Sequence, residues 1–265
     1  MKIGFIGCGN MGSALARATL KSGVCELFVS DASAEKAGAF ASEYGASVST
    51  NEKIARECDF IFLAVKPNVF PAVIEPLRDS FKANCGSVIV TMAAGLSLAR
   101  LGELLADNAH PVIRIMPNTP AAIGYGMILW CKNDYVSSER VGDFETLLSG
   151  AGKLDMIAES LIDAASAVSG CGPAFVYMFI EALADGAVEC GLPRDKAMAY
   201  AAETLIGAAE MVKQSGKHPG LLKDEVCSPG GSTIEGVRAL EEGAFRATAS
   251  RAVKEAYEKT KKLGK

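Results

Sequence analysis

The sequence predicts a doubly wound α/β sheet followed by an all-α C-terminal domain, and three observations support this fold class. Short apolar runs alternate with helical patterns up to about residue 158. Beyond that point only helical patterns follow. The first apolar run ends in a glycine-rich turn that opens a helix. Because continuous apolar strands separated by helices indicate a parallel sheet covered on both faces, we expect an α/β domain at residues 1–160 and a helical domain at residues 161–265.

The elements of the first domain follow from residue type and spacing. Each expected strand is a short apolar run rich in β-branched or aromatic residues. Each expected helix mixes spaced apolar residues with polar ones, and several of these helices end at glycine. The expected strands are 2–7, 27–31, 59–66, 87–93, 112–117 and 126–131. The expected helices are 11–23, 34–45, 69–81, 98–108 and 140–150.

The helices of the second domain are unusually apolar. The first turns of 173–190 carry apolar residues on every face, and 194–214 is rich in small residues. A helix that is apolar all round must be buried all round, and so short a domain forms few layers. We therefore expect a second copy of the chain to supply the cover, giving a homodimer; a thick helical core is the alternative. The expected helices are 160–168, 173–190, 194–214, 219–226, 232–241 and 244–263.

Composition narrows the class of protein. The 265 residues carry a net charge of −4 and no basic block of note, which argues against a nucleic-acid partner. Eight cysteines without a Cys-x-x-Cys pair and only two histidines predict no zinc site and favour a reducing compartment. Glycines interrupt the apolar start, and the apolar stretch 173–184 is short and contains Glu181. We expect a cytoplasmic protein with neither a signal peptide nor a membrane span.

The glycine-rich turn has the spacing of a dinucleotide-binding loop. Gly7, Gly9 and Gly12 form Gly-x-Gly-x-x-Gly between the first strand and the first helix. In a Rossmann-type fold the first glycine permits the tight turn, the second admits the pyrophosphate, and the third lets the helix pack on the strand. The N–H groups at the helix start then bind the phosphates. A glycine-rich turn without a ligand is the alternative.

An acidic residue follows the second strand. Asp31 lies where a carboxylate accepts hydrogen bonds from the adenine ribose hydroxyls, and its charge repels a 2′-phosphate. This placement favours NADH over NADPH. The neighbouring Ser30, Ser33 and Lys36 offer the opposite possibility, because they are suited to holding a 2′-phosphate.

Further loops lie at the expected carboxyl edge of the sheet, where ligands of such sheets bind. They are residues 64–67, 92–95 and 114–120. The small residues at 93–95 leave room for a flat ring. Lys66 is either a proton donor or an ordinary solvated or phosphate-facing charge, and we expect Asn118 to tie down its own loop.

A second glycine pair occurs near the C-terminal end, in the run "SPGGSTIEGV" at 228–237. Ser228 or Ser232 alone would cap the following helix. The glycine pair and two hydroxyls suggest in addition an anion site, because Gly230 and Gly231 let the backbone curl around a carboxylate and Ser232 and Thr233 add donors.

Taken together, these motifs resemble the pyrroline-5-carboxylate reductase family. The runs "IGCGNMG", "LAVKP", "RIMPNTP", "SGCGPAF", "EALADGAVECGLPR" and "LKDEVCSPGGSTIEGVRALEEGAFR" occur in the family's order across essentially the whole chain. The resemblance implies reduction of 1-pyrroline-5-carboxylate to L-proline by NADPH or NADH, the last step of proline biosynthesis. It also implies a C-terminal domain that interlocks with a partner to form homodimers, often assembled further.

The resemblance also implies site residues. Substrate contacts fall on Gly230, Gly231, Ser232 and Thr233, with Thr233 as the hydroxyl nearest the imine and the expected catalytic residue. Family members tend to carry Ser, Thr or Asn where this chain has Asp31, a departure that bears on the usual NADPH preference. The implied cofactor contacts, with Asp31 included from its position, are Gly7, Cys8, Gly9, Asn10, Met11, Gly12, Asp31, Asn51, Ala64, Val65, Lys66, Pro67, Ala93, Ala94 and Gly95.

Two rival functions remain. A β-hydroxyacid dehydrogenase or imine reductase has a related architecture, but the dehydrogenase needs a lysine, usually with an asparagine, on the interdomain helix, and 172–186 contains neither. A non-catalytic dinucleotide-binding protein would show a damaged substrate turn, whereas 228–234 is intact.

Overall fold

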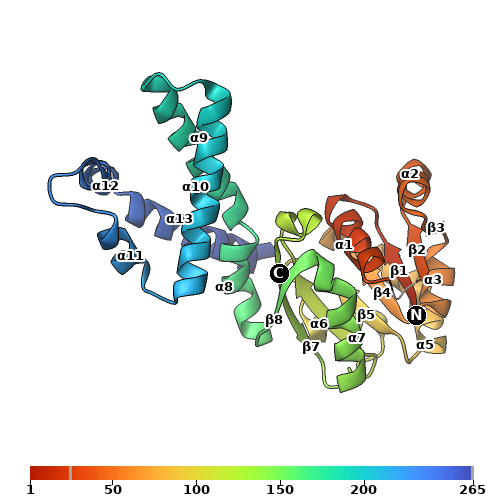
Figure 1. Cartoon of the computed structure of the whole chain (residues 1–265). Coiled ribbons are helices and arrows are strands. Elements are labelled where there is room, and N and C mark those ends of the chain that lie inside the picture. The colour runs from red at the N-terminus through yellow and green to blue at the C-terminus, as the bar shows by residue number, and fades with distance from the viewer. Residues whose placement is uncertain (24–25, 264–265) are drawn as a thin grey trace. The chain divides into compact units, whose positions relative to one another are not determined.

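The computed structural model describes residues 1–23 and 26–263 (Figure 1). The chain forms two compact units: Met1–Cys171 with Ala256–Lys265, and Gly172–Glu255. The last strand ends at Met156 and the next helix begins at Glu159. The domain boundary expected at residues 160 and 161 stays a prediction.

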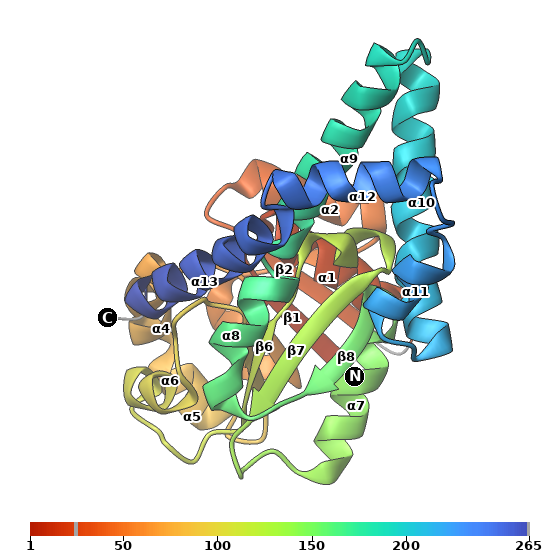
Figure 2. The ribbon, with the colours of Figure 1, turned by 90° about the vertical axis from the view of Figure 1, so that its left-hand side faces the viewer.

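The first unit is built on an eight-stranded sheet in the order β3-β2-β1-β4-β5-β6-β7-β8. Figure 2 shows the part of this sheet that contains β6, β7 and β8. The six expected strands are present. Strands β3 and β8 were not expected, because β3 has only two residues and β8 is mostly exposed or half-buried. The strands are β1 (Lys2–Ile6), β2 (Glu26–Ser30), β3 (Ser47–Val48), β4 (Phe60–Leu63), β5 (Val88–Thr91), β6 (Val112–Met116), β7 (Gly126–Lys132) and β8 (Gly152–Met156).

The expectation of a parallel sheet is wrong for one strand pair. β6 and β7 pair antiparallel, while every other neighbouring pair is parallel. Only residues 117–125 connect them, including the short helix η3 (Thr119–Ile123). A parallel return requires a crossover of a dozen or more residues, so this short link imposes an antiparallel pair.

Helices cover both faces of the sheet, as expected for its apolar strands. The helix expected at 69–81 is divided into four short pieces, because Pro71 and Pro76 begin new turns. These pieces are η1 (Pro67–Val69), α4 (Phe70–Ile74), η2 (Glu75–Leu77) and α5 (Arg78–Ala83). The other helical elements of this unit are α1 (Asn10–Lys21), α2 (Ala34–Tyr44), α3 (Asn51–Glu57), α6 (Leu98–Leu105), α7 (Ser138–Leu148), η4 (Ser149–Ala151) and α8 (Glu159–Ser169).

Two apolar layers enclose the sheet. One contains Phe5 and Phe62, whose rings stack with centroids 4.3 Å apart. The other contains Ile61, Ile89 and neighbouring residues on the opposite face. Strands β4, β5 and β6 are buried throughout, as a sheet covered on both faces requires.

The second unit consists of helices only, in agreement with the expectation. α9 and α10 pack on one another through a small buried cluster of Ala184, Ala197 and Ala201. The helices are α9 (Gly172–Glu189), α10 (Arg194–Ser215), α11 (Pro219–Glu225), α12 (Ser232–Glu242) and α13 (Phe245–Leu263), whose last residues belong to the first unit.

Most large apolar side chains of this unit are exposed in the single chain, among them Met178 at 69% and Tyr200 at 59%. By length and composition alone the helical stretch Glu159–Glu189 would suffice to cross a membrane, although such a test also selects helices that pack on protein. Exposed apolar area of this extent marks an interaction surface.

Candidate functional site

The glycine loop connects β1 to α1 and leaves the start of α1 open. Gly7 has a left-handed φ of 110°, and a Cβ there would lie 2.7 Å from the Ala64 carbonyl oxygen. A Cβ on Gly12 would lie 2.3 Å from the carbonyl oxygen of Gly7. These two glycines are required by the fold itself. A Cβ on Gly9 would meet no protein atom within 4 Å, so packing within the chain does not require this glycine and the space beside it is open.

The N-terminus of α1 has no side-chain cap, and its N-cap residue is Gly9. Helices α2, α3, α6 and α7 by contrast are each capped by a Ser or Thr hydroxyl. The first N–H groups of α1 therefore face a cavity of about 460 Å³. Open N–H groups together with the helix dipole favour an anion such as a pyrophosphate. The cavity is lined by Cys8, Gly9, Asn10, Met11, Ser13, Ala14, Arg17, Thr119 and Ala122.

The Asp31 carboxylate accepts hydrogen bonds from two backbone N–H groups, one of which belongs to the glycine loop. Its Oδ2 accepts a hydrogen bond from the Cys8 N–H at 2.7 Å, and its Oδ1 accepts one from the Ser33 N–H at 2.9 Å. The carboxylate therefore positions the glycine loop, a role that the sequence pattern did not indicate. Its negative charge remains at the end of β2, where the adenine ribose of a dinucleotide lies in this fold.

The neighbouring polar groups form a second hollow, of about 610 Å³, beside Asp31. The Ser30 hydroxyl donates to the Asn51 Oδ1 at 2.6 Å, and both residues line the hollow. The Ser33 hydroxyl accepts the Lys36 N–H as the cap of α2. Ser30 and Ser33, two of the residues that are suited to holding a 2′-phosphate, thus already make side-chain hydrogen bonds within the chain.

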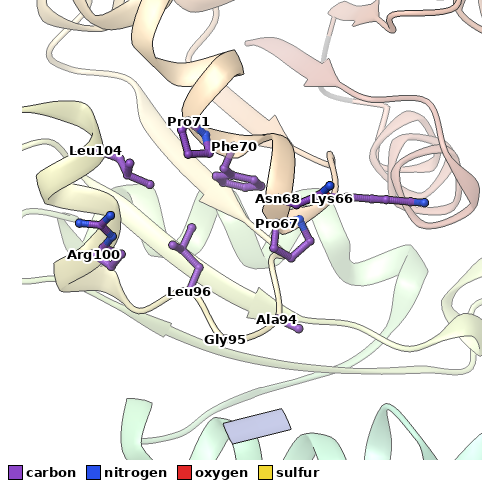
Figure 3. Close-up of a pocket in the computed structure, with 10 residues that line it drawn as sticks. All are labelled: Lys66, Pro67, Asn68, Phe70, Pro71, Ala94, Gly95, Leu96, Arg100 and Leu104. Atoms are coloured by element: carbon purple, nitrogen blue, oxygen red, sulfur yellow. The ribbon is translucent and has the colours of Figure 1, made fainter. Parts of the chain in front are cut away.

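Two further loops lie at the same edge of the sheet. β1, β4 and β5 are neighbours, so the loops that follow them meet at one edge. Between residues 66–71 and 94–104 lies a cavity of about 680 Å³ (Figure 3). Pro67 and Gly95 line it, and the Lys66 side chain extends away from Leu96 and Arg100. The structure thus brings together at one edge the loops that carry the predicted cofactor residues.

Asn118 ties down its own loop, as the sequence analysis expected. Its Oδ1 accepts the Met127 N–H at 2.9 Å, and its Nδ2 donates to the Ser169 carbonyl at 2.8 Å. The amide thereby joins η3, β7 and the end of α8.

Sequence reasoning missed Arg114 and Glu159. Arg114 lies in the middle of β6 and is 3% exposed, with ion pairs to Glu159 and Asp163 of α8. The sequence did contain one indication of this ion pair, a charged residue within the apolar run "VIRIM", because a charge is rarely buried without a partner.

Thiol chemistry does not contribute to the glycine loop. Burial, and then the charge of Asp31, raise the pKa of Cys8 to about 11. The thiol is therefore protonated at neutral pH and is a poor nucleophile. Among residues 1–23 and 26–263, no group of three or more His, Cys, Asp or Glu side chains is placed to hold a metal.

The glycine–hydroxyl turn opens α12 in the helical unit. Gly230 has a left-handed φ of 69°, and Gly231 is the N-cap. No side chain caps this helix, so the simpler interpretation, in which Ser228 or Ser232 serves as the cap, is wrong. A Cβ on Gly231 would lie 2.4 Å from the Ser228 Oγ, a side-chain atom that can rotate away, and 3.2 Å from the Ser228 carbonyl oxygen. The first N–H groups of α12, like those of α1, remain available to an anion.

Comparisons with known proteins agree over the whole chain. Residues 159–263 match the model of the pyrroline-5-carboxylate reductase dimerisation family, and residues 2–95 match that of the coenzyme F420-dependent NADP oxidoreductases. The chain is similar to pyrroline-5-carboxylate reductase of Escherichia coli, with 42% identity covering 100% of the chain and 98% of the relative. The Arabidopsis thaliana reductase is 39% identical, covering 99% of the chain and 95% of the relative.

Solved structures give the same result. The chain is similar to Plasmodium falciparum pyrroline carboxylate reductase with NADP bound, with a TM-score of 0.90 and 34% identity, covering 100% of this chain and 98% of that one. An imine reductase from Streptomyces aurantiacus, 19% identical with a TM-score of 0.57, shares the fold alone.

Proposed function

Since the chain belongs to the pyrroline-5-carboxylate reductase family and reduces 1-pyrroline-5-carboxylate to L-proline with NAD(P)H, we propose how its own residues carry out this reaction. The observation that carries the proposal is that α1 and α12 each have a glycine as N-cap and no side-chain cap. One lies in each unit, and a helix N-terminus of this kind is suited to binding an anion.

The dinucleotide is proposed to bind along the carboxyl edge of the sheet. The N–H groups of residues 9–12 bind the pyrophosphate, and the absent side chain of Gly9 lets it approach. Asp31 and Asn51 lie on the adenosine side. Residues 64–67 and 93–95 flank the nicotinamide, which when bound supplies the hydride.

The turn at 230–233 is proposed to bind the substrate carboxylate. The backbone of Gly230 and Gly231 and the N–H groups that open α12 donate to the anion without a cationic side chain. Fixing the carboxylate presents one face of the ring for reduction.

The proton requirement is small, because the imine nitrogen can arrive already protonated. Thr233 is proposed to hydrogen-bond the ring nitrogen as it becomes an amine. Cys8 is unsuited to a proton-transfer role because its pKa is raised to about 11. A lysine is also missing from α9, where an alcohol dehydrogenase of this architecture needs one, so the rival chemistry lacks its acid–base group.

Cofactor choice is proposed to favour NADH. The charge of Asp31 repels a 2′-phosphate, and the Ser33 hydroxyl that would otherwise hold one already caps α2. The family includes a member whose structure has NADP bound, so this preference would distinguish the present chain from that relative.

The family's dimerisation domain is present at residues 159–263, and we propose a homodimer formed through α9 and α10, with dimers assembling further. The exposed apolar side chains of these helices supply the contact area. We further propose that the enzyme works in the cytoplasm.

One assay tests activity and cofactor choice together. Oxidation of NADH and of NADPH is followed with pyrroline-5-carboxylate as substrate, in the wild-type enzyme and in Asp31→Asn. We expect a higher kcat/KM with NADH and a shift of the NADH/NADPH ratio toward NADPH in the variant. Damage to the glycine loop lowers both values together and leaves the ratio unchanged. A wide wild-type preference for NADPH would contradict the role given to Asp31.

A further inference from the structure

A buried guanidinium joins β6 to α8. Arg114 Nη2 donates to the Asp163 Oδ1 at 2.8 Å, and Nη1 donates to the Glu159 Oε1 at 3.3 Å. The Arg114 side chain is only 4% exposed, and the two carboxylates lie one helical turn apart. A buried charge is tolerated where such partners compensate it. Arg114 therefore fixes both carboxylates relative to the sheet.

Glu159 has a second partner that Asp163 lacks. The same Oε1 accepts the backbone N–H of Leu98 at 2.7 Å. Leu98 is the first residue of α6, so the carboxylate satisfies an open N–H at a helix start, where a negative charge is favoured. Glu159 thus connects α8 to the segment that follows the loop at 93–95.

The loop itself is fixed at its two ends. At one end the Ala93 N–H donates to the Thr91 Oγ1 at 3.4 Å, next to β5. At the other end Leu98 is bonded to Glu159. Between them Gly95 adopts a left-handed φ of 76°, and the Leu96 N–H bonds the Ala93 carbonyl at 3.4 Å. The bond at Leu98 is the shorter of the two end bonds.

We propose that Glu159, oriented by Arg114, is a positioning residue for the loop at 93–95 and thereby for the reacting ring of the dinucleotide. This inference rests on the proposed placement of the nicotinamide beside that loop. This role requires no contact of Glu159 with substrate or cofactor. It acts by holding Leu98, so loss of its carboxylate loosens the loop while the fold is retained.

Asp163 provides a matched control. Its side chain is 28% exposed and that of Glu159 is 33% exposed, and each pairs with Arg114. Removing either one leaves Arg114 with one carboxylate. Glu159→Ala also removes the bond to Leu98, whereas Asp163→Ala removes the shorter of the two bonds to Arg114, so we expect comparable costs in folding. Only Glu159 is bonded to the segment after the loop.

The experiment uses full-length Glu159→Ala, Glu159→Gln and Asp163→Ala. Melting temperature, the Kd of NADH and NADPH by calorimetry, and kcat and KM are measured for each. We expect the two alanine variants to melt at similar temperatures, below that of the wild type. We expect Glu159→Ala to raise the cofactor Kd about tenfold, which corresponds to the free-energy contribution of one charge-assisted hydrogen bond. Asp163→Ala should leave the cofactor Kd within about twofold of the wild-type value. Glu159→Gln, which keeps an acceptor oxygen for Leu98, recovers most of the affinity.

Equal changes of cofactor affinity in both alanine variants, or none in either, would overturn the inference. If Glu159→Ala fails to fold, Glu159→Asp keeps the charge beside Arg114 with a shorter reach. An unchanged cofactor Kd in that variant would overturn the inference equally. A wild-type enzyme that binds the dinucleotide but does not reduce pyrroline-5-carboxylate would instead refute the proposed function.

Discussion

The two units of the chain bury their apolar residues to very different extents. In the α/β unit, strands β4, β5 and β6 are buried on both faces, and aromatic residues such as Phe5 and Trp130 are almost inaccessible. In the helical unit, the buried residues of α9 and α10 are three alanines, while Tyr177, Met178 and Tyr200 are exposed.

The α/β unit is therefore stabilised by its own core, whereas the helical unit depends on contacts with another chain. The α/β unit has its own core and can present an ordered phosphate-binding loop. The helical unit has the apolar composition of a protein core, but most of its large apolar side chains are exposed in the single chain. A second chain must therefore cover them. The turn proposed to bind the substrate belongs to the unit that depends on that partner, so we expect dimerisation to be a condition for activity as well as for stability.

The largest expected effect comes from placing a charge on the exposed apolar surface of the helical unit. Met178→Glu puts an unpaired carboxylate where the partner is expected, at a cost of about 3 kcal/mol or more. We expect loss of the dimer in light-scattering measurements and loss of activity. Tyr135→Glu, at a similarly exposed site in the α/β unit, is the control and should leave mass and activity unchanged. A dimeric, active Met178→Glu enzyme would rule out this surface.

The next effect distinguishes glycines within the cofactor loop. Gly12→Ala forces a Cβ to within 2.3 Å of the Gly7 carbonyl oxygen, so both stability and cofactor affinity should fall. Gly9→Ala meets no protein atom, so we expect an unchanged melting temperature and a cofactor affinity that is about 10- to 100-fold weaker. Calorimetric titration with the preferred cofactor provides the measurement. Undiminished affinity in Gly9→Ala would place the pyrophosphate elsewhere.

A change in the helical unit should affect substrate and spare cofactor. Thr233→Val removes one hydroxyl donor, and we expect kcat/KM for pyrroline-5-carboxylate to fall about tenfold or more while cofactor Kd is unchanged. Thr146→Val, on an exposed face of α7 in the α/β unit where the hydroxyl bonds the Gly142 carbonyl, is the matched control. Steady-state kinetics identical to the wild type would remove Thr233 from the mechanism.

The smallest expected effect is a pH dependence confined to the α/β unit. Burial lowers the pKa of His110 below its ordinary 6.5, against an opposing contribution from Asp107 at 4.0 Å. Above pH 6.5 His110 is neutral in both folded and unfolded chains. As the pH falls below 6.5, the unfolded chain takes up the proton first, so stability is lost until the folded-state pKa is passed.

Replacing this histidine removes that contribution. Arg78, Asp79 and Lys82 also face the hollow beside His110 and are retained in the variant. We expect His110→Gln to lose less melting temperature than the wild type between pH 6.5 and 5, as measured by calorimetry. Parallel curves for the two proteins would show that His110 does not contribute to the pH dependence.

Sequence patterns were sufficient for whatever depends on local periodicity or on a glycine spacing. The helices of the second unit and six of the eight strands follow from such patterns. Strand direction does not, because β7 is as apolar as a parallel strand and only the short link before it determines its reversal. Side-chain pairings between residues far apart in the sequence could not be predicted either. Nothing near Asp31 in the chain indicates that its carboxylate bonds the Cys8 N–H, and nothing near Arg114 indicates that its ion-pair partner is Glu159.

The reversal at β7 has a consequence for where the chain leaves the sheet. In an all-parallel arrangement every helix runs from the carboxyl edge back toward the opposite edge. β8 runs with β7, against the other six strands, so α8 climbs the other way, from Arg114 in the middle of β6 to Asn118 beyond its end. The antiparallel β6–β7 pair therefore places the end of α8 at the carboxyl edge of strands β1 to β6, where the dinucleotide is expected to bind. The position at which the chain leaves the α/β unit is thus fixed by that unit alone.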